Sequence, residues 1–294
     1  MTPTRCLYTL AILIGLCSAR PAFCEAVPPL PSAGCALDRI ETGRRLVGRI
    51  AVGGTARDYI LDVPDAVRPH VPAPLLLDFH GFGHSGAGVW NVSGFKALAA
   101  RAGFVTVYPE GLPVRLTIHG QELERPGWEM FTIDGNRDLA FVRALLDDME
   151  RRYCIDRRRV FATGFSNGAF FSALLGCAMS DRIAAVAPVS GGPLRVPCTP
   201  GRSVPILIQH GRQDDLIPIE YARNARDDWL KVDGCAPNDK AADGPACTRW
   251  SACRGSAVVE FCEEDFTHTW PPQATARVWD FLQQHPLPAA ATDR

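Results

Sequence analysis

The sequence predicts an α/β fold, with a mostly parallel central sheet, helices on both faces and an antiparallel hairpin at the N-terminal edge. Three observations support this prediction. Short apolar runs alternate with helical patterns along most of the 294-residue chain. Two strand-like segments, separated only by Gly53-Gly54, precede that alternation. An apolar content of 47% fits one large domain with a sizeable core.

The first residues have the pattern of a secretory signal peptide. Arg5 supplies a positive charge, the apolar stretch from Leu7 to Leu16 is too short to span a bilayer, and small residues follow it. We expect a signal peptide over residues 1–24, cleaved at about 24–26, and a single domain over 27–294. An uncleaved anchor is the alternative. Cleavage predicts a secreted protein, extracellular or periplasmic, that no longer contacts a membrane.

The cysteine count supports cleavage near residues 24–26. Of eleven cysteines, this cut leaves eight: Cys35, Cys154, Cys177, Cys198, Cys235, Cys247, Cys253 and Cys262. An even number suits a disulfide framework in an oxidising compartment, whereas a cut after Ala19 leaves an odd thiol. Spacing does not choose among the possible pairings. Because no C-x-x-C pair is present, the cysteines do not predict a zinc site.

The predicted elements follow in chain order. A β-hairpin is expected over Arg44–Val52 and Thr55–Val63. Short apolar runs then predict buried strands at Leu75–Phe79, Phe104–Tyr108, Val160–Thr163, Ala184–Val189, Ile206–Gln209 and Ala257–Phe261. Helices are expected at Gly94–Arg101, Arg137–Tyr153, Ala169–Met179, Ile219–Val232 and Gln273–Gln284.

Two segments carry no clear pattern. Gly111–Ile133 is irregular and contains Trp128, and Gly234–Gly255 is polar and holds three cysteines. Such loops often shape the site at the carboxyl ends of the strands in α/β sheets. For Gly234–Gly255, a plain surface excursion is an equal alternative.

Gly164-Phe165-Ser166-Asn167-Gly168 is the most specific motif in the chain. It follows a predicted strand and precedes a predicted helix, as a G-x-S-x-G nucleophile elbow requires. The glycines are needed because the turn is tight and neighbouring backbone comes close. The sequence therefore predicts an α/β-hydrolase fold with Ser166 as the nucleophile.

A serine hydroxyl needs an adjacent base, and in this fold the acid and then the histidine follow the serine in the chain. His210 precedes the acid candidates and His285 lies in the Pro-rich tail, so we expect His268 to be the general base. The loop after Gln209 contains Asp214 and Asp215. One of them is expected to accept the imidazole N–H, and spacing gives only a slight preference between them.

An oxyanion hole needs two backbone N–H groups. One is expected from Asn167, which follows the nucleophile, and the other from the glycine-rich loop His80-Gly81-Phe82-Gly83-His84-Ser85-Gly86. We choose the N–H of Phe82. A phosphate-binding loop is the competing interpretation, but the G-K-[ST] ending is missing.

With these motifs in place, the chain resembles the secreted polyhydroxybutyrate depolymerase-like and feruloyl esterases, including bacterial LpqC-type esterases. The resemblance runs from about Arg44 to Phe281. Its matching stretches are Leu77-Asp78-Phe79-His80-Gly81, Ile155-Asp156-Arg157-Arg158-Arg159-Val160, Thr163-Gly164-Phe165-Ser166-Asn167-Gly168-Ala169, Asp181-Arg182-Ile183-Ala184-Ala185-Val186-Ala187-Pro188-Val189-Ser190-Gly191, Val204-Pro205-Ile206-Leu207-Ile208-Gln209-His210-Gly211 with Ile217-Pro218, and His268-Thr269-Trp270-Pro271.

The resemblance implies that the acid is Asp214 and that the histidine is His268. Glycines usually precede that histidine in the family, whereas Glu264-Asp265-Phe266-Thr267 stand there in this chain. The path of this loop is therefore open. Trp128 and Trp270 are candidates for binding an aromatic acyl group or a polysaccharide, with a core or rim position as the alternative.

The predicted function is hydrolysis of polymer-linked carboxylic esters, either feruloyl or acetyl esters of plant polysaccharide or short-chain polyhydroxyalkanoate. No metal or cofactor is expected, and we expect a monomer. A serine peptidase and a catalytically inactive binding relative are the alternatives.

The net charge of −1, without a basic run, gives no case for nucleic acid or anionic membranes. Asn91-Val92-Ser93 is a glycosylation sequon for a eukaryotic secretory host.

Overall fold

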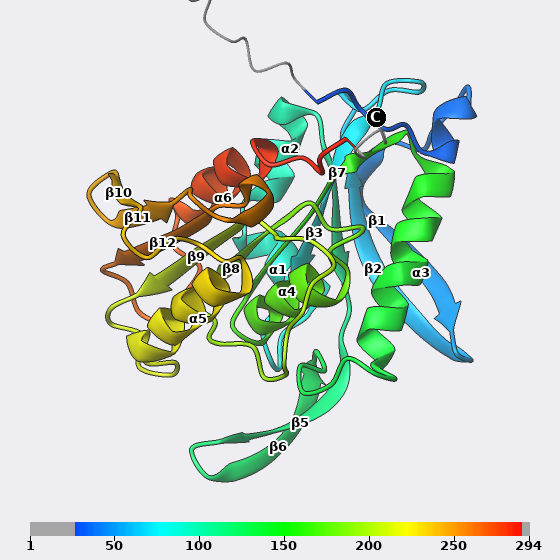
Figure 1. The fold of residues 1–294 in the computed structure, drawn as a ribbon. Helices are drawn as coiled ribbons and strands as arrows, with labels where there is room; N and C mark the ends of the chain where they lie inside the picture. The colour runs from blue at the N-terminus through cyan, green and yellow to red at the C-terminus, as the bar shows by residue number, and fades with distance from the viewer. Residues whose placement is uncertain (1–26, 290–294) are drawn as a thin grey trace, which may run out of the picture.

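The structure, a computed structural model, describes residues 27–289. The predicted signal peptide and its cleavage region therefore lie outside the described residues. A ten-stranded sheet runs through the molecule in the order β1-β2-β4-β3-β7-β8-β9-β12-β11-β10 (Figure 1). The strands span Gly43–Val52 (β1), Thr55–Val63 (β2), Ala73–Phe79 (β3), Val105–Pro109 (β4), Ile155–Phe165 (β7), Ala185–Val189 (β8), Ile206–Gly211 (β9), Lys240–Asp243 (β10), Cys247–Trp250 (β11) and Val259–Glu264 (β12).

The centre of the sheet is parallel and both edges are antiparallel. The strands from β4 to β12 in the sheet order pair in parallel, whereas β1, β2, β10 and β11 join by antiparallel pairing. Carboxyl ends of parallel strands meet at one edge, so residues that follow β3, β7, β9 and β12 come together there.

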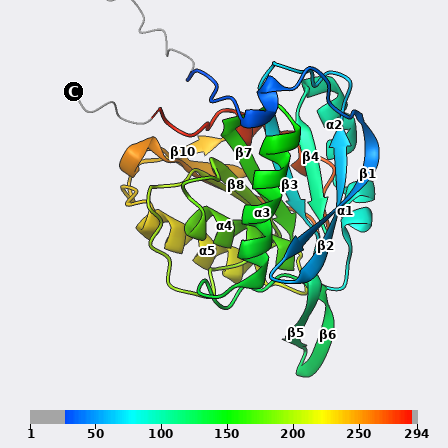
Figure 2. The same ribbon diagram turned by 90° about the vertical axis from the view of Figure 1, so that its right-hand side faces the viewer.

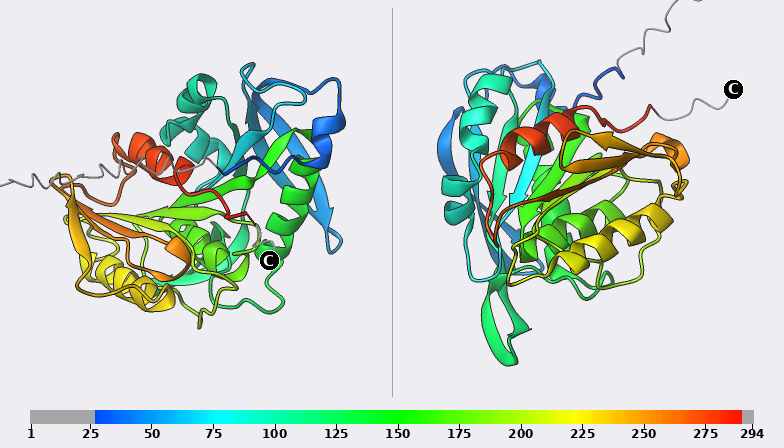
Figure 3. Two further views of the ribbon diagram at one scale, coloured as in Figure 1. Left: turned by 45° about the horizontal axis from the view of Figure 1, so that its top comes forward. Right: turned by 90° about the vertical axis from the view of Figure 1, so that its left-hand side faces the viewer.

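Helices cover both faces of the sheet, as the alternating pattern predicted. They span Gly86–Val92 (α1), Phe95–Ala102 (α2), Arg137–Arg152 (α3), Asn167–Ala178 (α4), Ile219–Val232 (α5) and Ala274–Gln283 (α6). A large core under α3, α4 and α5 contains Leu145, Phe171 and Trp229, and a second core under α2 and α6 contains Phe95 and Trp279. Figure 3 shows α5 and α6 on opposite sides of the sheet. The predicted α/β-hydrolase architecture is confirmed.

Most predicted elements are present, and the largest boundary error is at β7. The N-terminal hairpin has the expected register, with Val52 opposite Thr55 across the glycine turn. β7 begins at Ile155, five residues before the predicted start. The reason is that residues 156–159 are polar or charged and interrupt the apolar run, although Ile155 still pairs with Ala73 of β3.

Both segments without a clear pattern form hairpins. In the first, Leu112–Ile118 (β5) and Gln121–Gly127 (β6) make a separate two-stranded sheet that projects from the body of the molecule (Figure 2). In the second, β10 and β11 extend the main sheet beyond β12. The second segment is thus an addition to the sheet edge rather than a loop over the strand ends.

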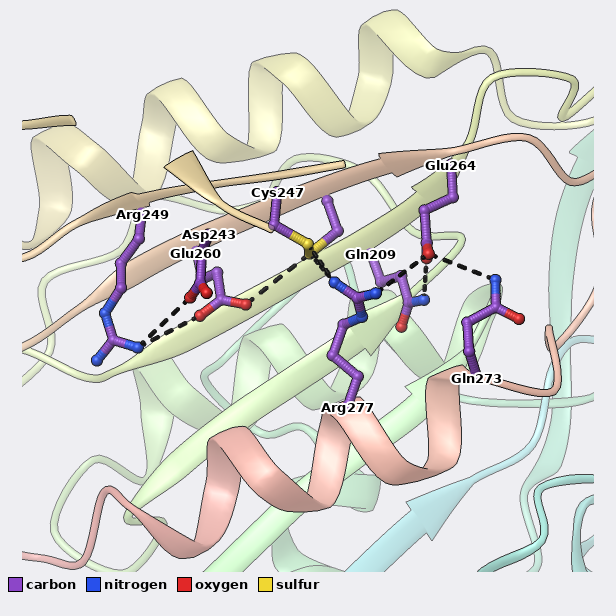
Figure 4. The surroundings of a disulfide bond; sticks show 9 residues. Gln209, Asp243, Cys247, Arg249, Glu260, Glu264, Gln273 and Arg277 are labelled. Atoms are coloured by element: carbon purple, nitrogen blue, oxygen red, sulfur yellow. Dashed lines mark hydrogen bonds and ion pairs between the residues drawn. A yellow bond between two sulfur atoms is a disulfide. The ribbon is translucent and has the colours of Figure 1, made fainter. Parts of the chain in front are cut away.

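All eight cysteines expected to pair form disulfides, which confirms the predicted framework. The pairs are Cys35–Cys154, Cys177–Cys198, Cys235–Cys253 and Cys247–Cys262. The last pair links neighbouring strands β11 and β12, and the guanidinium of Arg277 lies against its sulfurs (Figure 4). Within residues 27–289, no helix has the length and apolar character needed to cross a bilayer.

Candidate active site

Ser166 lies in a strained turn between β7 and α4. Its backbone has φ 56° and ψ −119°, a conformation that side-chain-bearing residues rarely adopt. A Cβ atom at Gly168 would lie 2.2 Å from the carbonyl oxygen of Phe79, and one at Gly164 would lie 2.5 Å from the carbonyl oxygen of Gly168. The two glycines of the motif are therefore required because β3, β7 and α4 touch at this turn. The Ser166 side chain remains partly exposed.

His268 and Asp214 form a direct pair. The Nδ1 of His268 lies 2.8 Å from Oδ2 of Asp214, and the other carboxylate oxygen accepts hydrogen bonds from the backbone N–H groups of Leu216 and Ile217 at 3.1 and 2.8 Å. Since an ionised carboxylate only accepts, the His268 Nδ1 is the donor and its Nε2 is left to act as a base. Asp214 is 6% exposed, whereas Asp215 is exposed. The structure therefore pairs Asp214, rather than Asp215, with His268.

The surroundings of Asp214 keep it ionised. Burial opposes its charge, but the hydrogen bonds from His268 and from the Ile217 N–H outweigh that effect, and the net result lowers the pKa of Asp214 below its ordinary value. A second histidine, His210, lies behind the pair with its Nε2 2.8 Å from the carbonyl oxygen of Ile217. Burial lowers the pKa of His210, so it is neutral and donates to that carbonyl. His210 therefore supports the loop that carries the acid.

The loops that carry the acid and the base are paired through their backbones. The N–H of Arg212 donates to the carbonyl of Glu264 at 2.8 Å, and that of Gln213 donates to the carbonyl of Phe266 at 3.2 Å. Residues 264–267, where the family usually has glycines, all carry side chains in this chain, and their backbone still pairs with the loop after β9. A Cβ atom at Gly211 would lie 2.0 Å from the Phe266 carbonyl oxygen. The glycine of His210-Gly211 is what allows the two loops to meet.

Glu264 fixes both ends of the loop that carries His268. It ends β12, and its carboxylate accepts hydrogen bonds from Gln209 of β9, from Gln273 at 3.4 Å and from Arg277 of α6 at 3.3 Å. Figure 4 shows these three side chains converging on Glu264. Because Gln273 follows the loop and Glu264 precedes it, this network closes the loop and sets its path.

The sheet brings the serine and the paired residues to one edge. Ser166 follows β7, Asp214 follows β9 and His268 follows β12, three strands that run parallel in this part of the sheet. The His268 ring packs against the ring of Phe165, the neighbour of Ser166, with ring centroids 4.7 Å apart.

The two candidate oxyanion donors border the same cleft as Ser166. Asn167 is the first residue of α4, so its backbone N–H has no acceptor within the helix. The loop that carries Phe82 is in close contact with the nucleophile, since a Cβ atom at Gly81 would lie 3.3 Å from the Cβ of Ser166. This placement leaves both N–H groups available near the serine.

His80 is hydrogen-bonded to the loop that carries Phe82. Burial lowers the pKa of His80 to about 4, so the ring is neutral. Its Nε2 accepts a hydrogen bond from the N–H of Gly111 at 2.9 Å, and its Nδ1 therefore carries the proton and donates to the carbonyl of Gly81 at 2.8 Å. The base of the projecting hairpin and the oxyanion loop are thus tied through one imidazole.

Trp128 is a core residue, so the prediction that it binds substrate is wrong. It is fully buried, with its ring stacked on Phe171, and its Nε1 donates to the carbonyl of His80 at 2.9 Å. The side-chain amide of Asn167 holds the Trp128 backbone by accepting from its N–H at 2.7 Å and donating to its carbonyl at 3.1 Å. Trp128 therefore positions the site without facing it.

Trp270 is half-buried where the start of α6 meets α2. Its Nε1 donates to Oγ1 of Thr275 at 3.1 Å, and its ring meets Phe95 edge to face. These contacts join the start of α6 to α2. A substrate contact by Trp270 stays a prediction.

The cleft next to Ser166 has a volume of about 580 Å³ and mostly apolar walls. Its large side chains include Phe82, Met130, Phe131, Phe170, Leu216 and Tyr221, and residues 115–119 of the β5–β6 hairpin form part of its border. Phe131, Leu216 and Tyr221 are 53%, 39% and 40% exposed. The sequence did not indicate that these residues line a cleft, because it does not distinguish a buried large apolar residue in a loop from an exposed one.

The chain is similar in sequence to proteins that are named as esterases. It is 30% identical over 243 residues to feruloyl esterase C of Emericella nidulans, covering 77% of this chain and 83% of that protein. It is 28% identical to feruloyl esterase B of Piromyces equi and 27% identical to the bifunctional acetylxylan esterase/xylanase XynS20E of Neocallimastix patriciarum, covering 79% of this chain in each comparison. The chain spans 46% and 34% of the length of these last two proteins. No family model matches the chain.

Solved structures with the same fold are also esterases by title. The acetyl xylan esterase from Aspergillus awamori aligns with a TM-score of 0.63 at 16% identity, covering 81% of this chain and 99% of that one. A structure titled ferulic acid esterase aligns with a TM-score of 0.56 at 18% identity, covering 81% and 96%. At these identities the likeness shows the fold, while the sequence relatives show the family. The chain therefore belongs to the feruloyl esterase family on the α/β-hydrolase fold.

Proposed function

We propose that this chain is a serine carboxylic ester hydrolase in which Ser166 is the nucleophile, His268 the general base and Asp214 the residue that orients the imidazole. The observation that carries the proposal is the 2.8 Å pair between His268 and Asp214 at the sheet edge where Ser166 occupies its strained turn. Such a pair fixes the tautomer of the imidazole and stabilises its protonated form during the reaction.

The first half of the proposed reaction forms an acyl-enzyme. His268 Nε2 takes the proton of the Ser166 hydroxyl as Oγ attacks the ester carbonyl carbon, which makes a tetrahedral intermediate. The N–H groups of Phe82 and Asn167 stabilise the negative charge on its oxygen. The C–O bond to the alcohol then breaks, and His268 returns the proton to the leaving alkoxide.

The second half releases the acid. His268 takes a proton from a water molecule as that water attacks the acyl carbon, and the same two N–H groups stabilise the second intermediate. The bond to Ser166 breaks, and its oxygen regains the proton from His268. Asp214 stays ionised throughout, because its lowered pKa leaves it charged over the neutral range.

The substrate class follows from the cleft and from the relatives. We propose feruloyl or acetyl esters of plant polysaccharide, since relatives at 27–30% identity are named as feruloyl and acetylxylan esterases. Partly exposed Phe131 and Tyr221 offer flat apolar surface to an aromatic acyl group. Esters of short-chain polyhydroxyalkanoate are the alternative for the same cleft. The four disulfides suit an oxidising compartment and support secretion of the enzyme, which we propose to be a monomer.

The test is covalent labelling followed by turnover. A fluorophosphonate probe is expected to label the mature protein and to fail with Ser166→Ala, while the matched variant Ser251→Ala, at an exposed serine of the β10–β11 region, is labelled normally. Methyl ferulate, an acetylated xylan, p-nitrophenyl butyrate, a polyhydroxybutyrate film and a peptide amide then distinguish the substrate classes. Unchanged labelling of Ser166→Ala would disprove the proposed nucleophile, and cleavage of the peptide alone would indicate a peptidase.

A further inference from the structure

We propose that the cleft contains a carboxylate-binding subsite built on Arg195, so that the preferred esters carry a carboxylate close to the ester bond. The inference rests on the proposed ester hydrolysis and specifies its substrate further.

The charge of the cleft differs in sign from that of the chain. Arg115, His119 and Arg195 are the basic residues on its border, and no aspartate or glutamate of the described part of the chain lines it. The whole chain has a formal net charge of −1. A guanidinium without a neighbouring carboxylate on the cleft border attracts anions, and apolar walls strengthen that effect.

Arg195 is held in place without an ion pair. It lies in the segment between β8 and β9, and its guanidinium carbon is 5.3 Å from the ring centroid of Phe170 and 5.5 Å from that of Tyr221. Arg195 is exposed, and none of the ion pairs found within residues 27–289 involves it. Aromatic contacts restrict the guanidinium plane while its N–H donors stay available for a ligand.

A disulfide fixes the segment that carries Arg195. Cys198, three residues further on, is bonded to Cys177 of α4, the helix that starts at the nucleophile elbow. Phe170, under the guanidinium, belongs to the same helix. Arg195 is thus linked to α4, the helix that begins directly after Ser166. This link restricts where its guanidinium can lie relative to the reacting ester.

Arg115 is another arginine on the cleft border and can be compared with Arg195. Its guanidinium lies 3.4 Å from Glu122 and 3.1 Å from Glu124, two carboxylates of the β5–β6 hairpin. Its charge is therefore already compensated, whereas that of Arg195 is not. This difference makes Arg195, and not Arg115, the binding residue of the proposal.

A carboxylate is the anion that esters of plant polysaccharide supply, and a guanidinium binds it with two parallel hydrogen bonds. It has two possible sources. An acidic sugar places it on the alcohol side of the ester, and a half-ester of a dicarboxylic acid places it on the acyl side. Each source can be compared with a neutral substrate of nearly the same shape.

The test measures kcat/KM on two matched pairs. For the alcohol side, a feruloyl ester of galacturonate is compared with that of galactose; for the acyl side, mono-4-nitrophenyl adipate is compared with 4-nitrophenyl hexanoate. We expect the wild type to prefer the charged member of one pair, and Arg195→Gln to reduce kcat/KM for that member by about 10- to 100-fold, mainly through KM. The neutral members, and all four esters with the control Arg101→Gln at an exposed arginine outside the cleft, are expected to change by less than about threefold.

Several outcomes overturn the proposal. Equal losses on charged and neutral esters with Arg195→Gln would mean a structural role, and Arg195→Lys is expected to recover part of the preference only if charge is recognised. Turnover by the wild type without preference in either pair would reject the subsite and leave the proposed hydrolysis intact. No turnover of any of the four esters would reject the proposed function itself, and the subsite with it.

Discussion

Two adjacent carboxylates have opposite environments in this molecule. Asp214 is buried between a histidine and two backbone N–H groups, and Asp215 points to solvent one residue later. Residue type does not distinguish them, because both are aspartates in the same turn. Their contacts distinguish them, so substituting each aspartate in turn tests which of the two acts as the acid.

We expect Asp214→Asn to reduce kcat about 10³- to 10⁴-fold, because an amide no longer stabilises the charged imidazole or fixes its tautomer. Asp215→Asn is expected to retain at least half of the activity. Steady-state kinetics on methyl ferulate with both variants checks this prediction. Similar losses in the two variants would contradict the assignment of the acid.

Asp78 is a second residue whose behaviour depends on burial. Burial raises its pKa to about 7, far above an ordinary value of about 4. The native state therefore keeps the proton between about pH 4 and 7 while the unfolded chain releases it. A native state that binds more protons than the unfolded one becomes less stable as pH rises, so the ionisation of Asp78 reduces stability over this range.

The variant Asp78→Asn cannot ionise, so its stability relative to the wild type is expected to improve on going from pH 4 to pH 8, by on the order of 2–4 kcal/mol. Urea unfolding at several pH values measures the difference, with the exposed Asp215→Asn as the control. A difference that stays constant with pH would show that Asp78 titrates normally.

At the scale of elements, the site depends on two loops that meet through their backbones. The loop after β9 carries Asp214 and the loop after β12 carries His268. They pair through Arg212 and Gln213, and Gly211 leaves the space for their contact. A side chain at Gly211 has no room, because the nearest atom is a backbone carbonyl oxygen rather than a flexible side chain.

Gly211→Ala is therefore expected to separate the two loops, lowering kcat/KM by at least about tenfold and the free energy of unfolding by roughly 1–3 kcal/mol. The control is Gly88→Ala in α1, where a Cβ atom has only ordinary contact at 3.4 Å. Ester turnover and thermal unfolding of the two variants check the prediction. Full activity of Gly211→Ala would show that the loop contact is not needed.

The projecting β5–β6 hairpin is the second element with a functional expectation. Its strand β5 borders the cleft, and its base is tied to His80 and to Asn167 through Trp128. The tip carries none of these ties. The hairpin projects from the body of the molecule (Figure 2). Because residues 115–119 also border the cleft, a polymer rather than a small ester is expected to reach along it.

Replacing residues 115–124 by Asn-Gly shortens the hairpin beyond Val114 and Arg125, which are paired in the native register. We expect kcat/KM to fall about tenfold or more on feruloylated polysaccharide and by less than about threefold on p-nitrophenyl butyrate, because lost remote contacts affect the longer substrate. Equal effects on both substrates would instead indicate damage to the serine or to the oxyanion loop.

At the scale of the whole molecule, the disulfides differ in how much chain they enclose. Cys35–Cys154 joins residues 119 apart and holds the N-terminal segment to β7, where the N–H of Ser32 donates to the carbonyl of Ile155 at 2.9 Å. Cys235–Cys253 joins residues that are only 18 apart and encloses the β10–β11 hairpin. A crosslink that encloses more chain removes more freedom from the unfolded state.

Double substitution to alanine is expected to lower the free energy of unfolding by about 2–5 kcal/mol at either disulfide, with the larger loss for Cys35–Cys154. Urea unfolding of the two double variants gives the order. The reverse order would show that local contacts, rather than the length of enclosed chain, dominate.

The pattern of the sequence predicted most of the sheet, because each central strand is an apolar run bounded by polar residues. It did not predict the β5–β6 hairpin. His119 and Gly120 both have positive φ, as a tight two-residue hairpin turn requires, but histidine is not among the residues that usually mark such a turn. Proline also stands in both strands, at Pro113 and Pro126, which face each other across the pair and weaken the strand pattern.

The sequence by itself determined the fold and the strand–turn–helix context of Ser166, and it predicted His268 as the base, because local backbone requirements and chain order restrict those residues strongly. It left Asp214 and Asp215 nearly equal and misplaced Trp128. Only the tertiary structure showed that Asp214 pairs with His268 and that Trp128 is buried, since burial and pairing depend on strands and loops far apart in the chain. For the same reason, the exposed apolar walls of the cleft and the unpaired charge of Arg195 became visible only in the folded molecule.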